Sequence, residues 1–140
     1  MLVAGNIQGT VGQTVDMKIV LDNVTTGLSG FQLTIQVDNP SVAIIESIVF
    51  PSYDPIPSLG FTKTDPSPPT ASTEVTAVDL LQAIEPESPS PTGYVLFTLQ
   101  IRLLLSGSQT SVTVSSVGKL NDDSGADIVA QRIPGSVIVN

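Results

Sequence analysis

The residues from Gly30 to Asp38 alternate strictly between apolar and polar side chains, and this pattern constrains the fold more than any other stretch. Phe31, Leu33, Ile35 and Val37 would point to one side of a β-strand, and the residues between them would point to the other. The apolar side chains are large and β-favouring, and the polar ones are uncharged until the last. The pattern predicts a half-buried strand whose outer face suits contact with another protein better than a catalytic cleft.

Most of the remaining chain also has the period of a strand. We expect further strands over residues 2–8, 14–22, 42–50, 58–64, 72–80, 94–105, 110–117, 127–133 and 135–140. Prolines flank residues 58–64, so this strand should lie at a sheet edge, whereas residues 94–105 should lie mid-sheet. Short strands separated by turn signals, about nine in all, predict an all-β, two-sheet β-sandwich. Its shared core should contain Val15, Ile19, Phe31, Leu33, Ile35, Phe97, Leu99 and Ile101.

Length and charge limit the function classes. A chain of 140 residues is the usual size for a single domain, so we expect one domain over residues 1–140. Thirteen acidic residues against five basic ones give a net charge of -8, which opposes binding to nucleic acid and to anionic membrane surfaces. No apolar run is long enough to insert across a bilayer, since about 18 residues are needed.

The side chains that commonly carry catalysis or hold transition metals are scarce. The chain has no histidine and no cysteine, which removes the usual general bases, nucleophile partners and thiolate ligands. Asp54, Asp65, Glu74 and Asp79 stand in no context that indicates a buried carboxylate pair. We therefore expect no enzyme activity and no cofactor. Residues 121–127 carry three carboxylates and could hold calcium, but they lack the spacing of an EF-hand loop, so a plain turn is favoured.

Four segments, in this order and spacing, carry a resemblance to a known family. They are Gly12-Gln13-Thr14-Val15, Gly30-Phe31-Gln32-Leu33 with the following Val37-Asp38-Asn39-Pro40-Ser41-Val42, Gly93-Tyr94-Val95-Leu96-Phe97, and Gly135-Ser136-Val137-Ile138-Val139. Over nearly its whole length the chain resembles a cohesin domain, the receptor module of cellulosome scaffoldins that also occurs on bacterial and archaeal surface proteins.

The resemblance implies a nine-stranded jelly roll that binds the calcium-loaded dockerin module of another protein. It implies an extracellular or cell-surface location within a larger secreted protein, a monomeric free domain, and calcium on the partner rather than on this chain. In the family, dockerin covers the sheet that holds the third, fifth, sixth and eighth strands. Mapped by strand order, the implied contact residues are Gln32, Thr34, Gln36, Phe61, Lys63, Glu74, Thr76, Thr113 and Ser115.

Two other functions are compatible with a β-sandwich. A carbohydrate-binding module would need exposed aromatic rings, but the chain has no Trp, two Tyr and four Phe, and the pattern places Phe31 and Phe97 in the core. A structural spacer of a cell-surface or S-layer protein is the other alternative, because a spacer can keep the fold without a partner. The polar strand faces would then be ordinary solvated surfaces.

Overall fold

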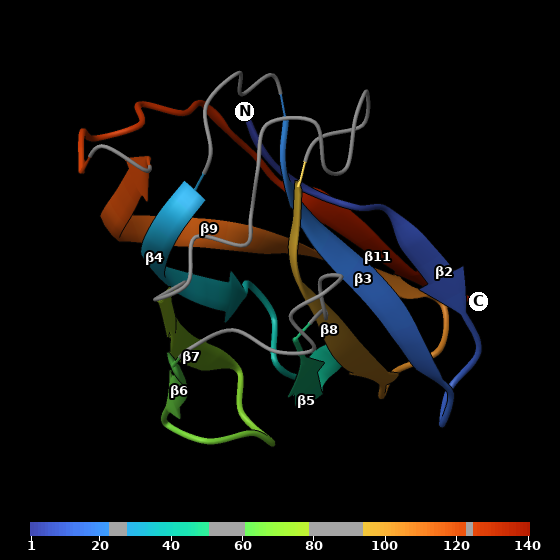
Figure 1. Ribbon diagram of the computed structural model, residues 1–140. Helices are drawn as coiled ribbons and strands as arrows, with labels where there is room; N and C mark the ends of the chain where they lie inside the picture. The colour runs from blue at the N-terminus through green and yellow to red at the C-terminus, as the bar shows by residue number, and fades with distance from the viewer. Residues whose placement is uncertain (23–27, 51–60, 79–93, 123–124) are drawn as a thin grey trace.

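The computed structural model describes residues 1–22, 28–50, 61–78, 94–122 and 125–140, which form two β-sheets packed face to face (Figure 1). The described part contains eleven strands, more than the nine expected, and no helix. No segment within it could therefore cross a membrane as a helix. The predicted all-β, two-sheet sandwich is confirmed.

The first sheet has five strands and is mixed, because β10 and β1 run parallel while the others are antiparallel. The mid-sheet place predicted for residues 94–105 is confirmed, since β8 pairs with strands on both sides. In order across the sheet the strands are β10 (Arg132–Ile133), β1 (Leu2–Ala4), β3 (Thr14–Leu21), β8 (Tyr94–Leu103) and β5 (Ala43–Val49).

The second sheet has six strands, and the segment with strictly alternating apolar and polar residues lies at its centre. That segment is β4, which pairs with β9 on one side and with β7 on the other. The edge position predicted for residues 58–64 is also confirmed, since β6 ends the sheet. In order the strands are β2 (Ile7–Gly9), β11 (Gly135–Val139), β9 (Ser108–Asp122), β4 (Leu28–Val37), β7 (Ser72–Val78) and β6 (Phe61–Asp65).

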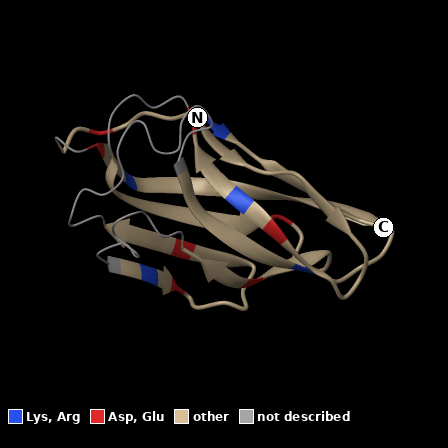
Figure 2. Ribbon diagram, turned by 45° about the vertical axis from the view of Figure 1, so that its right-hand side comes forward, with Lys and Arg blue, Asp and Glu red and all other residues tan. Residues whose placement is uncertain are grey.

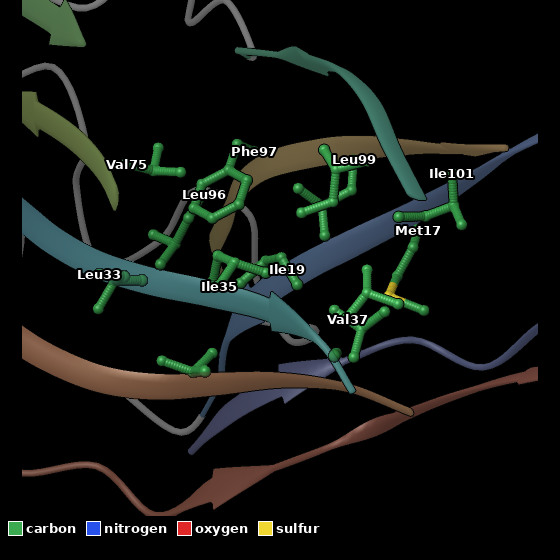
Figure 3. Close-up of a cluster of buried hydrophobic side chains, with 14 of the residues drawn as sticks. Met17, Ile19, Leu33, Ile35, Val37, Val75, Leu96, Phe97, Leu99 and Ile101 are labelled. Carbon is green, nitrogen blue, oxygen red and sulfur yellow. The ribbon is translucent and has the colours of Figure 1, made fainter. Parts of the chain in front are cut away.

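The core lies between the two sheets, where the inner rows of β3 and β8 face those of β4 and β7 (Figure 3). The predicted core residues are buried there, except that Val15 is partly exposed at the margin. Leu96, which the alternation of β8 would place outside, is also fully buried. It lies at an irregularity where Ile19 pairs with Phe97 and Val20 with Val95, so Leu96 is an extra residue that can turn inward.

Two expected strands differ from the structure. Residues 2–8 form two strands rather than one, because the chain leaves β1 in the first sheet and enters β2 in the second. Of residues 127–133 only Arg132 and Ile133 form a strand; Asp127 makes an isolated bridge to Asn121. The turn expected before them is supported by the backbone bond from Asp122 N–H to the carbonyl of Ala126.

Candidate partner-binding face

The outer side of β9, β4, β7 and β6 forms a continuous surface, called here the β4 face. Strand pairing arranges its side chains in rows that cross the strands, because directly paired residues point to the same side of a sheet. The Gln32 row is Lys119, Gln32, Thr76 and Lys63; the Thr34 row is Ser116, Thr34, Glu74 and Asp65; the Gln36 row is Thr113, Gln36 and Ser72.

All nine residues implied by the resemblance lie on these four strands. The three from β4 point outward, since the residues between them are buried. Glu74 and Thr76 on β7 share that side, and Lys63 pairs directly with Thr76. Thr113 pairs with Gln36 and completes the same surface. Phe61 pairs with Val78, but its side chain lies outside the described part.

The ninth residue, Ser115, does not occupy the row position that a regular strand would give it. Between Thr113 and Lys119 the pairing of β9 with β4 shifts twice, so that Ser116 lies opposite Thr34 and Lys119 lies opposite Gln32. Ser115 is the extra residue of the first bulge and donates its hydroxyl to the carbonyl of Thr34, 3.3 Å away. The structure thus adds Ser116 and Lys119 to the face, and neither was named from the sequence.

Arg132 supports the first bulge from the opposite edge of β9. Its guanidinium donates to the carbonyl of Val114 at 3.1 Å and to that of Ser115 at 2.9 Å. These two bonds satisfy carbonyl groups at the point where β9 has separated from β11, whose last pair with it is Gly135 and Val112. The bulged backbone under the β4 face is therefore held by a side chain as well as by strand pairing.

The β4 face is polar but sparsely cross-linked. Gln32 donates from Nε2 to a carboxylate oxygen of Glu74 at 2.8 Å, which ties two rows together. Thr113 donates its hydroxyl to Asp38 at 3.3 Å. Gln36, Lys63 and the remaining charged side chains are exposed. A surface of this kind offers hydrogen-bonding groups along straight rows and can accept a partner without being rebuilt.

A shallow hollow of about 270 Å³ interrupts the face at Gly30. Gly30 lies between Asn121 and Val78 in the adjacent strands and contributes no side chain, so the surface is lower there. An added Cβ at Gly30 would stand 3.1 Å from the carbonyl oxygen of Ala77. The hollow is lined by Ser29, Gly30, Phe31, Gln32, Thr76, Ala77, Val78, Lys119 and Asn121.

The face offers little for catalysis or for metal binding. No group of three or more His, Cys, Asp or Glu side chains gathers anywhere in the described part of the chain. Glu74 and Asp65 are directly paired, a juxtaposition that sequence analysis did not find. Both are exposed on the sheet surface, whereas a carboxylate acting as an acid near neutral pH is usually shielded from water.

Comparisons of the structure give one consistent result. A non-cellulosomal cohesin from the archaeon Archaeoglobus fulgidus superposes with a TM-score of 0.74 and 15% identity, over 100% of this chain and 90% of that chain. The sixth cohesin of Acetivibrio cellulolyticus scaffoldin B, solved with a Cel5 dockerin mutant, gives 0.76 and 16%, over 99% and 97%. The chain has the cohesin fold.

A Clostridium thermocellum type I complex of the OlpA cohesin with the dockerin Doc918 agrees equally well, with a TM-score of 0.76, 16% identity and coverage of 99% and 97%. Protein-family models and curated proteins, by contrast, give no match. The cohesin fold therefore persists here at an identity of about one residue in six, and the resemblance noted in the sequence is confirmed at the level of fold.

Proposed function

We propose that this cohesin-fold domain is a non-catalytic receptor that binds a calcium-loaded dockerin module through the β4 face. The observation that carries the proposal is the full-length agreement with cohesins that were themselves solved in complex with dockerins. The β4 face supports it, because its four strands bring seven of the nine implied contact residues into rows on one exposed surface.

The proposed setting follows from the partner. A domain that binds dockerin would assemble extracellular or cell-surface complexes as part of a larger secreted protein, and it would be monomeric when free. Calcium would be needed by the dockerin and not by this chain. The carbohydrate-binding alternative is less well supported, since Phe31 and Phe97 are buried in the core and the chain has no Trp.

The test is calorimetric titration with dockerin modules encoded by the same genome, in calcium and again in excess chelator. We expect binding in calcium and its loss in chelator, because removing the ion unfolds the partner's binding-competent state. A binding curve that does not change with chelator would show that the partner is not a dockerin.

Thr34→Arg locates the site. Thr34 lies at the centre of the β4 face, so an arginine there should overlap the docked partner and lower affinity by at least a hundredfold. The thermal stability of the Thr34→Arg variant should change little, because the substituted side chain extends into solvent.

The matched control is Thr98→Arg. Thr98 is also a half-buried threonine on a central strand, but it pairs with Lys18 on the other sheet. It should bind like the wild type. Equal affinities for all three proteins would move the site away from the β4 face, and wild-type failure to bind any dockerin would favour the spacer alternative.

A further inference from the structure

Charge on the β4 face is ordered in a way that the overall composition does not suggest. The chain carries a net charge of -8 and only five basic residues, yet two of these, Lys119 and Lys63, lie at opposite ends of the Gln32 row. Three strand spacings separate them, roughly 14 Å along the row. Both side chains are exposed. Figure 2 colours the Lys and Arg positions of the ribbon blue and the Asp and Glu positions red.

The adjacent Thr34 row carries the opposite charge. Glu74 on β7 and Asp65 on β6 are directly paired and both exposed. Like charges at paired positions of two strands destabilise a sheet, so this pair costs the free domain stability. The two rows are two residues apart along β4, β7 and β6, or roughly 6.7 Å.

Among the described residues, none of these four side chains forms an ion pair. The described part of the chain does contain an ion pair, but it lies on the other sheet, where a guanidinium nitrogen of Arg102 is 3.6 Å from a carboxylate oxygen of Glu46. Glu74 accepts a hydrogen bond from the amide of Gln32, which is neutral and does not balance the charge of the carboxylate. The face is therefore polarised, with a cationic row beside an anionic pair, and both are available to a partner.

We propose that this polarity sets the orientation of the docked partner: a helix lies across the strands, above the line between the two rows. The proposal rests on the function proposed above and specifies the chemistry of its partner. A helix about 10 Å wide would present one flank to each row. Its flank over the Gln32 row carries two carboxylates, and its flank over the Thr34 row carries a lysine or arginine.

The spacing of the partner's carboxylates follows from the row. Helix positions seven apart are about 10.5 Å from each other on the same side, and positions eleven apart are about 16.5 Å. The strand positions of the two lysines are roughly 14 Å apart. Because the lysine side chains are long and flexible, their charged ends can move closer together or farther apart to match either helix spacing. Carboxylates seven or eleven residues apart therefore match the row, whereas a pair four residues apart, about 6 Å, would require both lysine side chains to bend toward each other along the row.

Charge reversal with a dockerin that binds the wild-type domain tests the orientation. We expect Lys63→Glu and Lys119→Glu each to weaken binding about tenfold at low salt, mainly through slower association, with a smaller effect at high salt. The matched control is Lys18→Glu, which makes the same change of charge at an exposed strand position on the other sheet. It should weaken binding less than twofold.

The reciprocal arm changes the partner. Replacing the matching dockerin carboxylate by lysine should restore most of the affinity lost in Lys63→Glu or Lys119→Glu, which a loss of fold would not allow. Wild-type binding with Lys63→Glu and Lys119→Glu both equal to the Lys18→Glu control would overturn the inference and leave the proposed function standing. Restoration by two carboxylates only four residues apart would overturn the crosswise orientation. Absence of wild-type binding to every dockerin would overturn both proposals.

Discussion

Phe97→Ala is the substitution that most directly tests the packing between the two sheets. Phe97 projects from β8 into the middle of the core and is 0% exposed (Figure 3). Its ring is stacked on that of Phe31 in the opposite sheet, with centroids 5.7 Å apart. A second ring, that of Phe50, is tilted against it at 6.3 Å. The substitution thus removes contacts between the sheets and contacts within one of them.

The expected loss of unfolding free energy is large. Truncating a fully buried phenylalanine costs about 3–5 kcal/mol through lost burial and the cavity left behind. Each aromatic pair adds about 0.5–1.5 kcal/mol beyond its buried area, so two lost pairs place this site near the upper end of that range. The backbone of β8 is paired on both sides and cannot move in to fill the space.

Urea unfolding followed by circular dichroism measures the loss, because the chain has no Trp to report by fluorescence. The urea concentration at the unfolding midpoint should fall, while the slope of the unfolding free energy against urea concentration should stay constant. Val129→Ala serves as the control, since Val129 is 97% exposed and its truncation should be nearly neutral. A loss below about 1 kcal/mol for Phe97→Ala would show that this ring does not join the sheets as described.

Three further outcomes follow from the structure. Gly135→Ala should destabilise the fold by about 1–3 kcal/mol or more, as an added Cβ would stand 2.2 Å from the carbonyl oxygen of Gly5; a normal melting temperature would contradict that approach. Asp65→Asn should raise the melting temperature slightly, because it removes the repulsion between Asp65 and Glu74, and it should weaken dockerin binding. If melting temperature and dockerin affinity both rose or both fell, the proposed role of the pair would be refuted. Polysaccharide hydrolysis by the pure domain should equal that of buffer, and a turnover abolished by changing one carboxylate would disprove this.

The fold could be predicted because one face of most strands is buried. On β4 every second residue from Phe31 to Val37 lies in the core, so a period of two is imposed by the sandwich and is visible in the sequence. The same reasoning located β3, β7 and β11. It also assigned β6 to an edge, since prolines on both sides block further pairing.

The places where prediction failed share a physical cause. The split between β1 and β2 occurs at Gly5 and Asn6, where the chain crosses between sheets, and a crossing preserves the local β pattern. Residues 127–133 have β-favouring side chains, but most of them run past the edge of β9 without a strand partner, tied by Ile128 N–H to the carbonyl of Leu120. Local preference identifies extended chain and does not identify what the chain pairs with.

The candidate site depends on a feature of β9 that simple alternation cannot supply. Counting by twos from Thr113 would place Val117 opposite Gln32 and Lys119 opposite Gly30. The two bulges instead place Val117 opposite Leu33, where it is 39% exposed, and move Lys119 one row along. Gly118, a glycine within a strand, was the available signal for the second bulge.

This shift is what aligns the charges of the β4 face. In the unbulged register, Lys119 would stand beside the Gly30 hollow, one row away from Lys63, and the two lysines could not serve one helix crossing the strands. With the bulges they share the Gln32 row. The extra residues of β9 cost regular hydrogen bonds, and Arg132 replaces some of them by donating to the carbonyls of Val114 and Ser115. An irregular strand thus positions the charged side chain on which the proposed orientation depends.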